Sequence, residues 1–187
     1  MKAPFDPTAY GSGVASILAL EQNGERLVPL AEGTCSSSEA RHKLAAATQQ
    51  ELFPDAWSPA GAMSGLWLYF SCFEECHALC QDLETPEGSF WHGILHRQEP
   101  DAGNAGYWFR RVGTHAVFPQ IHSAAAEILS CYSVPLKLKD HWDALAFIDF
   151  CEEARRQPGS ESEKAALEIQ RAEWQILFNY CARPRQQ

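Results

Sequence analysis

Side chains that can carry protons, ligate metals or hold anions are concentrated in one segment of the sequence, SFWHGILHRQEPDAGNAGYWFRRVGTH (89–115). This short segment holds three of the seven histidines of the chain together with three arginines. Imidazole is the commonest metal ligand among side chains, and guanidinium groups pair with carboxylates and phosphates. The segment therefore predicts a site for a metal ion or for a small anion.

His92 and His96 are four residues apart in a segment that we expect to be a helix ending near Gln98. Thr85 followed by a proline and a glutamate is a typical helix start. Two imidazoles at this spacing lie on one side of a helix and can hold one metal ion, as in zincin helices. Gly93 stands where the zincin motif has its glutamate, so the zincin motif itself is absent.

A second polar stripe is expected on a long helix over residues 60–83, where Glu74 and His77 are three residues apart. Helical carboxylate–histidine metal sites use this spacing, although the sequence holds no second copy of the pair. Cys72, Cys76 and Cys80 fall on the apolar face of this helix and are expected in the core. The polar residues expected on its solvated face are Ser64, Ser71, Glu75 and Asp82.

A third polar stripe lies on a short helix expected over residues 102–112, which Gly113 should end. Its members recur at helical spacing and are Asn104, Tyr107, Trp108 and Arg111. We predict that Arg111 and Tyr107 orient an anionic or carbonyl substrate. A structural alternative is that Arg111 pairs with Asp101 or Glu99.

The candidate site residues have three roles. The candidate metal ligands are His92, His96, His77 and His115, and Glu74 is an alternative third ligand for zinc, manganese or iron. The candidate catalytic residues are Glu74, Tyr107 and Arg111. The candidate ligand-binding residues are Arg97, Asn104, Trp108 and Arg111.

Three functions are compatible with these residues. The first is a metal-dependent enzyme or metal-binding protein with a polar site between helices. The second is a metal-free pocket that binds a small anionic or polar ligand, with arginines and histidines as donors and tryptophans as walls. The third is a structural polar network without a catalytic role. Neither a GxSxG nucleophile elbow nor a phosphate-binding glycine loop is present.

The fold expected is an all-α bundle of about six or seven helices in a single domain, 1–187. Residues 1–36 are expected to be a loop-rich segment, with either a short hairpin or a helix and a turn near residues 17–30. Residues 37–182 are expected to form the helical core. Besides the helices above, the sequence predicts helices near 36–52, 118–131, 140–157 and 160–182, the last two joined as a hairpin at QPGS.

Composition limits the partners. The net charge of −9 repels nucleic-acid backbones, so we expect no nucleic-acid partner. No apolar stretch is long enough for a membrane span, and residues 1–13 lack the pattern of a signal peptide. The seven cysteines are read as reduced thiols, which favours a cytoplasmic location. The oligomeric state is not predicted.

The sequence also resembles an uncharacterised family of bacterial and fungal proteins with no known activity. The resemblance rests on GLWLYFSCFEECHALCQ (65–81), ETPEGSFWHGILHRQEPD (84–101) and NAGYWFRRVGTHAVF (104–118), with a weaker similarity in CSSSEARHKL (35–44). It departs from the family pattern at Ala116, where a proline is expected. The resemblance implies that the site lies among the same polar and aromatic residues, and it implies no reaction.

Overall fold

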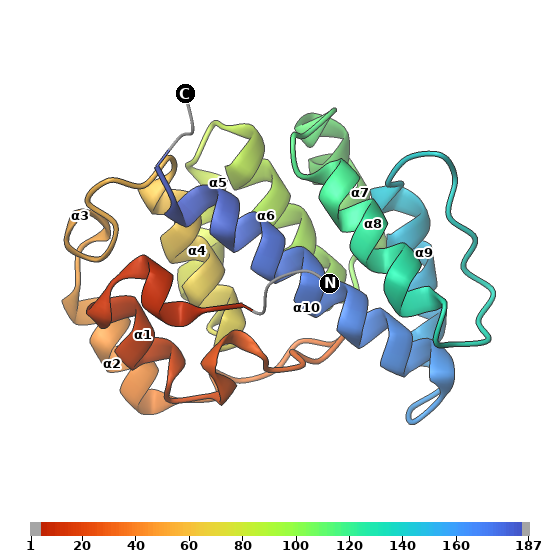
Figure 1. Cartoon of the computed structure of the whole chain (residues 1–187), viewed down its shortest axis with the longest axis horizontal. Coiled ribbons are helices and arrows are strands. Elements are labelled where there is room, and N and C mark those ends of the chain that lie inside the picture. The colour runs from red at the N-terminus through yellow and green to blue at the C-terminus, as the bar shows by residue number, and fades with distance from the viewer. Residues whose placement is uncertain (1–4, 185–187) are drawn as a thin grey trace.

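The structure is a computed structural model that describes residues 5–184, and within that range it contains ten α-helices, two 3₁₀ helices and no strand (Figure 1). The 3₁₀ helices are Pro7–Tyr10 and Gln22–Gly24. The α-helices are α1 (Ser12–Leu18), α2 (Ser38–Ala46), α3 (Gln49–Leu52), α4 (Pro59–Tyr69), α5 (Phe73–Gln81), α6 (Pro86–Gln98), α7 (Ala102–Val112), α8 (Phe118–Leu129), α9 (Ala144–Arg155) and α10 (Glu161–Ala182). The predicted all-α single domain is confirmed, with more helices than the six or seven expected.

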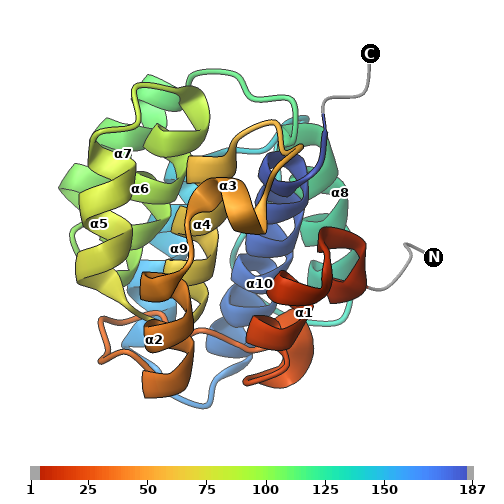
Figure 2. The same cartoon turned by 90° about the vertical axis from the view of Figure 1, so that its left-hand side faces the viewer.

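The longest helix, α10, crosses the molecule and packs against α4, α8 and α9 (Figure 1). On the other side of α4, the helices α5, α6 and α7 form a row in which α6 contacts both neighbours (Figure 2). The expected hairpin of α9 and α10 is present, with Ser160 capping α10. The row of α5, α6 and α7 carries all three polar stripes of the sequence.

Capping residues position α6 and α7. The hydroxyl of Thr85 accepts a hydrogen bond from the backbone N–H of Gly88 at 3.2 Å, and a proline occupies the first turn. The Asp101 carboxylate caps α7 by accepting from the N–H of Asn104 at 3.0 Å. Gly113 ends α7 with a φ of 64°, which glycine adopts readily. The predicted bounds of both helices are confirmed.

The prediction of one long helix over residues 60–83 is wrong, because α4 and α5 are separate helices. Ser71 lies between them with a φ of 55°. The Arg26 guanidinium reaches this break, where it donates to the backbone carbonyl of Tyr69 and to the hydroxyl of Ser71. A contact from a residue so distant in sequence leaves no pattern in residues 60–83 themselves.

Two of the serines expected to be solvated are buried instead. Ser64 is buried because α4 is packed against α5, α6 and α10, and its hydroxyl donates to the carbonyl of Ala60. Ser71 is buried beneath Arg26. The cysteine row was predicted correctly, since Cys72, Cys76 and Cys80 are all in the core.

The N-terminal half differs from expectation in two further places. The helix predicted near 36–52 is divided into α2 and α3, and Thr48 caps the second of them. Residues 17–30 contain the end of α1 and a 3₁₀ helix instead of a hairpin, as the helix-and-turn alternative predicted. Residues 1–4 of the predicted loop-rich segment, which also belong to the stretch tested for a signal peptide, lie outside the described residues.

One disulfide bond joins Cys35, in the loop before α2, to Cys72, at the start of α5. The expectation that all cysteines are reduced thiols is therefore wrong for this pair. The expectation of a cytoplasmic location rested on those thiols and loses that support. None of the helices in the described range combines the length and the apolar character needed to cross a membrane.

Candidate metal centre

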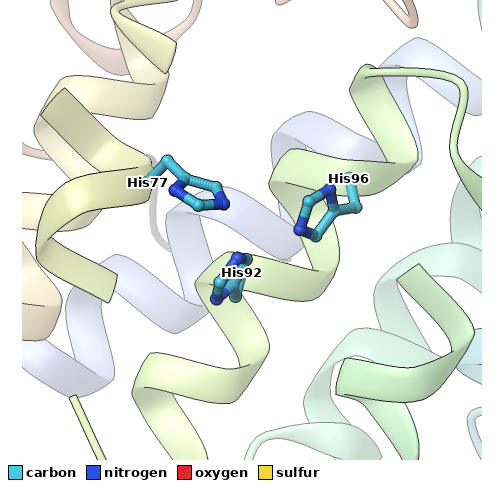
Figure 3. A group of neighbouring side chains, drawn as sticks. All are labelled: His77, His92 and His96. Atoms are coloured by element: carbon cyan, nitrogen blue, oxygen red, sulfur yellow. The ribbon is translucent and has the colours of Figure 1, made fainter. Parts of the chain in front are cut away.

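Three histidines converge between α5 and α6 (Figure 3). His77 projects from α5, and His92 and His96 project from consecutive turns of α6. One ring nitrogen of each histidine lies within 4.8 Å of the others. The nitrogens of a tetrahedral zinc site are about 3.3 Å apart, so side-chain rotation alone can bring the three onto one ion.

The rings of the three histidines are arranged around a stacked pair. His92 and His96 are nearly parallel, with centroids 4.7 Å apart and an interplanar angle of 18°. The ring of His77 is perpendicular to both, at 83° to His92 and 85° to His96. Because each lone pair lies in its ring plane, two parallel rings do not aim at one point. Binding an ion therefore requires one ring of the pair to turn.

His92 is held by packing and not by hydrogen bonds. It is 2% exposed, and neither of its ring nitrogens has a hydrogen-bond partner. Burial, followed by the neighbouring His96 and His77, lowers the pKa of His92 to about 3. The ring is thus neutral near pH 7, which is the form of imidazole that binds metals. A buried ring with two unpaired nitrogens is costly unless a ligand satisfies it.

His96 is oriented by two polar neighbours. Its Nδ1 is 2.7 Å from a carboxylate oxygen of Glu99, which can only accept, so the ring proton is placed on Nδ1. The side-chain amide nitrogen of Asn104 lies over the ring, 3.1 Å from Nε2 and 3.5 Å from Nδ1. A carboxylate on the far nitrogen is the usual support of a metal-ligating histidine. Nε2 is therefore the nitrogen that His96 can offer to an ion.

Helix α7 covers the histidines with an aromatic and cationic layer. The indole of Trp108 stacks on His92, with centroids 3.9 Å apart. The Arg111 guanidinium lies 5.2 Å from the centroid of Trp108 and donates to the hydroxyl of Tyr107 at 3.3 Å. The structural alternative for Arg111 is not found, since Glu99 pairs with His96 and Asp101 caps α7.

Close packing of α6 and α7 explains the glycine between the two histidines. A Cβ atom added at Gly93 would lie 2.8 Å from the ring of Phe109. A glutamate at this position, as in the zincin motif, would have no room. The residue that departs from the zincin pattern is thus the one that lets α7 approach α6.

Two of the candidate metal ligands, Glu74 and His115, lie apart from this centre. Glu74 is exposed and lines a surface pocket beside the disulfide instead of joining the histidine cluster. His115 is buried, with its Nε2 3.7 Å from a carboxylate oxygen of Glu87, and its ring contacts Phe90 and Tyr180. Of the candidate third ligands, the structure brings only His77 to the stacked pair.

Arg97 is directed into the core. It is 0% exposed, and it forms an ion pair at 2.5 Å with Glu173, which is also 0% exposed. Its guanidinium lies 4.5 Å from the ring centroid of Phe147. The predicted ligand-binding residue Arg97 therefore contacts α9 and α10, whereas Asn104, Trp108 and Arg111 lie on α7 around the histidines.

Sequence reasoning did not select Glu87 and Glu173, the acidic partners of His115 and Arg97. A signal for Glu173 exists, because it falls between Ile169 and Leu177 on the buried face of α10. A carboxylate in such a position predicts a buried cation. No comparable signal marks Glu87, whose place in the first turn of a helix is already explained by the helix dipole.

No protein-family model, curated protein or solved structure matches the chain. The resemblance to a bacterial and fungal family stays a prediction.

Proposed function

We propose that the protein binds one divalent transition metal ion through His77, His92 and His96. The observation that carries this proposal is the convergence of three imidazole nitrogens, one from each histidine, within 4.8 Å of one another. One of the three rings, that of His92, is buried with neither of its nitrogens hydrogen-bonded. Glu99 supports the proposal by holding His96 in the tautomer in which Nε2 carries no proton and can ligate an ion.

The donor set favours zinc or iron among the metals considered. Imidazole suits zinc, copper, iron and nickel, whereas manganese prefers carboxylate and carbonyl oxygens. The three converging side chains are all histidines, and the nearest carboxylate, that of Glu99, is engaged by a ring nitrogen. We expect manganese to bind more weakly than zinc.

We propose further that the site is catalytic. Structural zinc sites have four protein ligands, whereas catalytic ones have three and leave a position for water or substrate. An ion bound in this way lowers the pKa of a water ligand to about 7 and so supplies a nucleophile for hydrolysis. Tyr107 and Arg111 are the exposed polar residues of α7 beside the site and would orient the substrate.

Metal analysis of the purified protein tests this function. We expect about one equivalent of metal, and a higher melting temperature when zinc is added to the metal-free protein, because ligands that bind the native state stabilise it. His77→Ala should abolish both effects, whereas His42→Ala, an exposed histidine of α2, should change neither. Less than about 0.2 equivalents together with no thermal shift from zinc, iron, manganese or nickel would overturn the proposal.

A metal-free site for a small anion is the second candidate. The observation in its favour is that Arg111 is exposed and held against the aromatic rings of α7, with its two predicted acidic partners engaged elsewhere. Thermal shifts with malonate and phosphate on metal-free wild type and Arg111→Ala test it. Equal shifts in the two proteins would exclude a role for this arginine.

A further inference from the structure

Asn104 is placed to contact whatever else an ion in this centre binds. Its side-chain nitrogen lies 3.1 Å from Nε2 and 3.5 Å from Nδ1 of His96, which places it over the face of the ring and not on the in-plane lone pair of Nε2. An ion bound to Nε2 would lie in the plane of the ring, about 2.0–2.1 Å from that nitrogen, with the amide of Asn104 above the plane on one side of it. The ion would therefore leave the amide of Asn104 in place, close enough for one of its N–H groups to donate to another ligand of the ion.

The charge of the centre indicates what that acceptor is. Imidazole ligands add no charge to a divalent ion, and His92 and His96 are only 2% and 6% exposed. Glu99 supplies one negative charge from the far side of His96, and its side chain is 27% exposed. A buried charge is costly unless it is paired. An anionic ligand at the open position would complete the neutralisation of the ion.

The surroundings limit the size of this ligand. Trp108 covers one face of His92, and the close packing of Phe109 on Gly93 seals α6 against α7. The more accessible residues of the centre are His77 and Asn104, which are both partly buried. A ligand that reaches the ion from this side meets the amide of Asn104 first.

We infer that the open position of the metal centre takes a small oxygen anion of the carboxylate or hydroxamate class, and that Asn104 donates a hydrogen bond to it. This inference rests on the proposed metal-binding function. It assigns Asn104 the role of a hydrogen-bond donor to the ligand and not that of a metal ligand, because its amide nitrogen is a donor and cannot ligate a metal.

Cobalt(II) in place of the native ion tests the inference, since its visible spectrum changes when a ligand enters. The cobalt protein is titrated with acetohydroxamate, with acetate and with acetamide, which is the uncharged analogue of acetate. We expect the two acids to bind and acetamide not to bind. In Asn104→Leu we expect the affinity for both acids to fall about tenfold, the usual effect of losing a hydrogen bond to a charged group.

Asn179→Leu is the matched control. Asn179 is also partly buried, but it accepts a hydrogen bond from Tyr10 far from the histidines, so its replacement should leave both affinities unchanged. Retained cobalt binding shows that Asn104→Leu is folded. Equal affinity of the acids for wild type and Asn104→Leu, or binding of acetamide as tightly as acetate, would overturn the inference while leaving the metal site intact. Failure of the wild type to bind cobalt or any other metal would overturn the proposed function as well.

Discussion

The imidazole of His92 lies flat against the indole of Trp108, with ring centroids 3.9 Å apart and planes 16° apart. Stacking fixes the position of the ring while leaving both of its nitrogens without partners. A histidine kept only for structure is ordinarily hydrogen-bonded when buried. The absence of hydrogen bonds to its ring therefore argues against a purely structural role for His92.

His92→Phe is expected to keep or raise the melting temperature of the metal-free protein. The phenyl ring preserves the stack on Trp108 and removes two buried polar atoms that lack partners. The same variant should lose the thermal shift caused by zinc. Differential scanning calorimetry with and without zinc measures both effects. A melting temperature lowered by many degrees would favour the structural polar network instead.

Glu99→Gln is expected to weaken zinc binding by about 10- to 100-fold, the usual effect of removing the carboxylate behind a ligating histidine. The carboxylate contacts Nδ1 of His96 at 2.7 Å and makes the other ring nitrogen, Nε2, more basic and so a stronger metal ligand. Competition with a chromophoric chelator measures the affinity. Glu74→Gln is the matched control, because Glu74 is exposed and outside the histidine cluster. Equal losses in both variants would show that only the overall charge matters.

The parts of the centre that depend on local sequence were predictable. The capping residues Thr85 and Asp101 and the terminal Gly113 define α6 and α7, because caps act within one turn. The spacing of His92 and His96 then places them on one side of α6. The third ligand was left open among three candidates, since it depends on how α5 packs against α6 and not on any spacing within one helix.

The parts that depend on contacts distant in sequence were not predictable. The break between α4 and α5 is held by Arg26, more than forty positions away, and by the disulfide to Cys35. The direction of Arg97 depends on Glu173, which follows 76 residues later. Helical periodicity places a residue on a face, but it does not say which helix that face meets.

The pair of Glu87 and His115 predicts loss of stability in acid. Burial raises the pKa of Glu87, but the His115 ring, whose Nε2 lies 3.7 Å from the carboxylate, and hydrogen-bond donors that include the Trp57 indole outweigh this and lower the pKa to about 2, from an ordinary value of about 4.5. A depressed carboxyl pKa stabilises the fold above the ordinary value, and this contribution is lost as pH falls from about 4.5 to about 2.

Urea unfolding between pH 2.5 and pH 7 measures this contribution, which we expect to be about 2 to 3 kcal/mol. Glu87→Gln should lower the stability at pH 7 and flatten its pH dependence below pH 4.5. Asp82→Asn is a control, since Asp82 is an exposed carboxylate. An unchanged slope in Glu87→Gln would show that other carboxylates cause the acid unfolding.

The disulfide between Cys35 and Cys72 is expected to contribute about 3–4 kcal/mol, since closing a loop of 37 residues reduces the entropy of the unfolded chain. Cys35→Ser should therefore lower the free energy of unfolding by this amount, and a reducing agent should lower that of the wild type equally. Cys35→Ser itself should not respond to the reducing agent. A response of similar size in the variant would place the effect at other cysteines.

Arg97 and Glu173 form a buried ion pair whose two halves depend on each other. Arg97→Met should cost about 3–5 kcal/mol, because it leaves the Glu173 carboxylate charged and unpaired in the core. The double variant Arg97→Met/Glu173→Leu should recover most of that loss, since replacing a buried pair by apolar residues is often neutral. Urea unfolding of the two single variants and the double variant gives the coupling energy. The double variant also tests the prediction that Arg97 binds a ligand. Its affinities for zinc and for anions should stay within about twofold of wild type if Arg97 has a role only in the core, because changes at residues that share no partner do not affect each other.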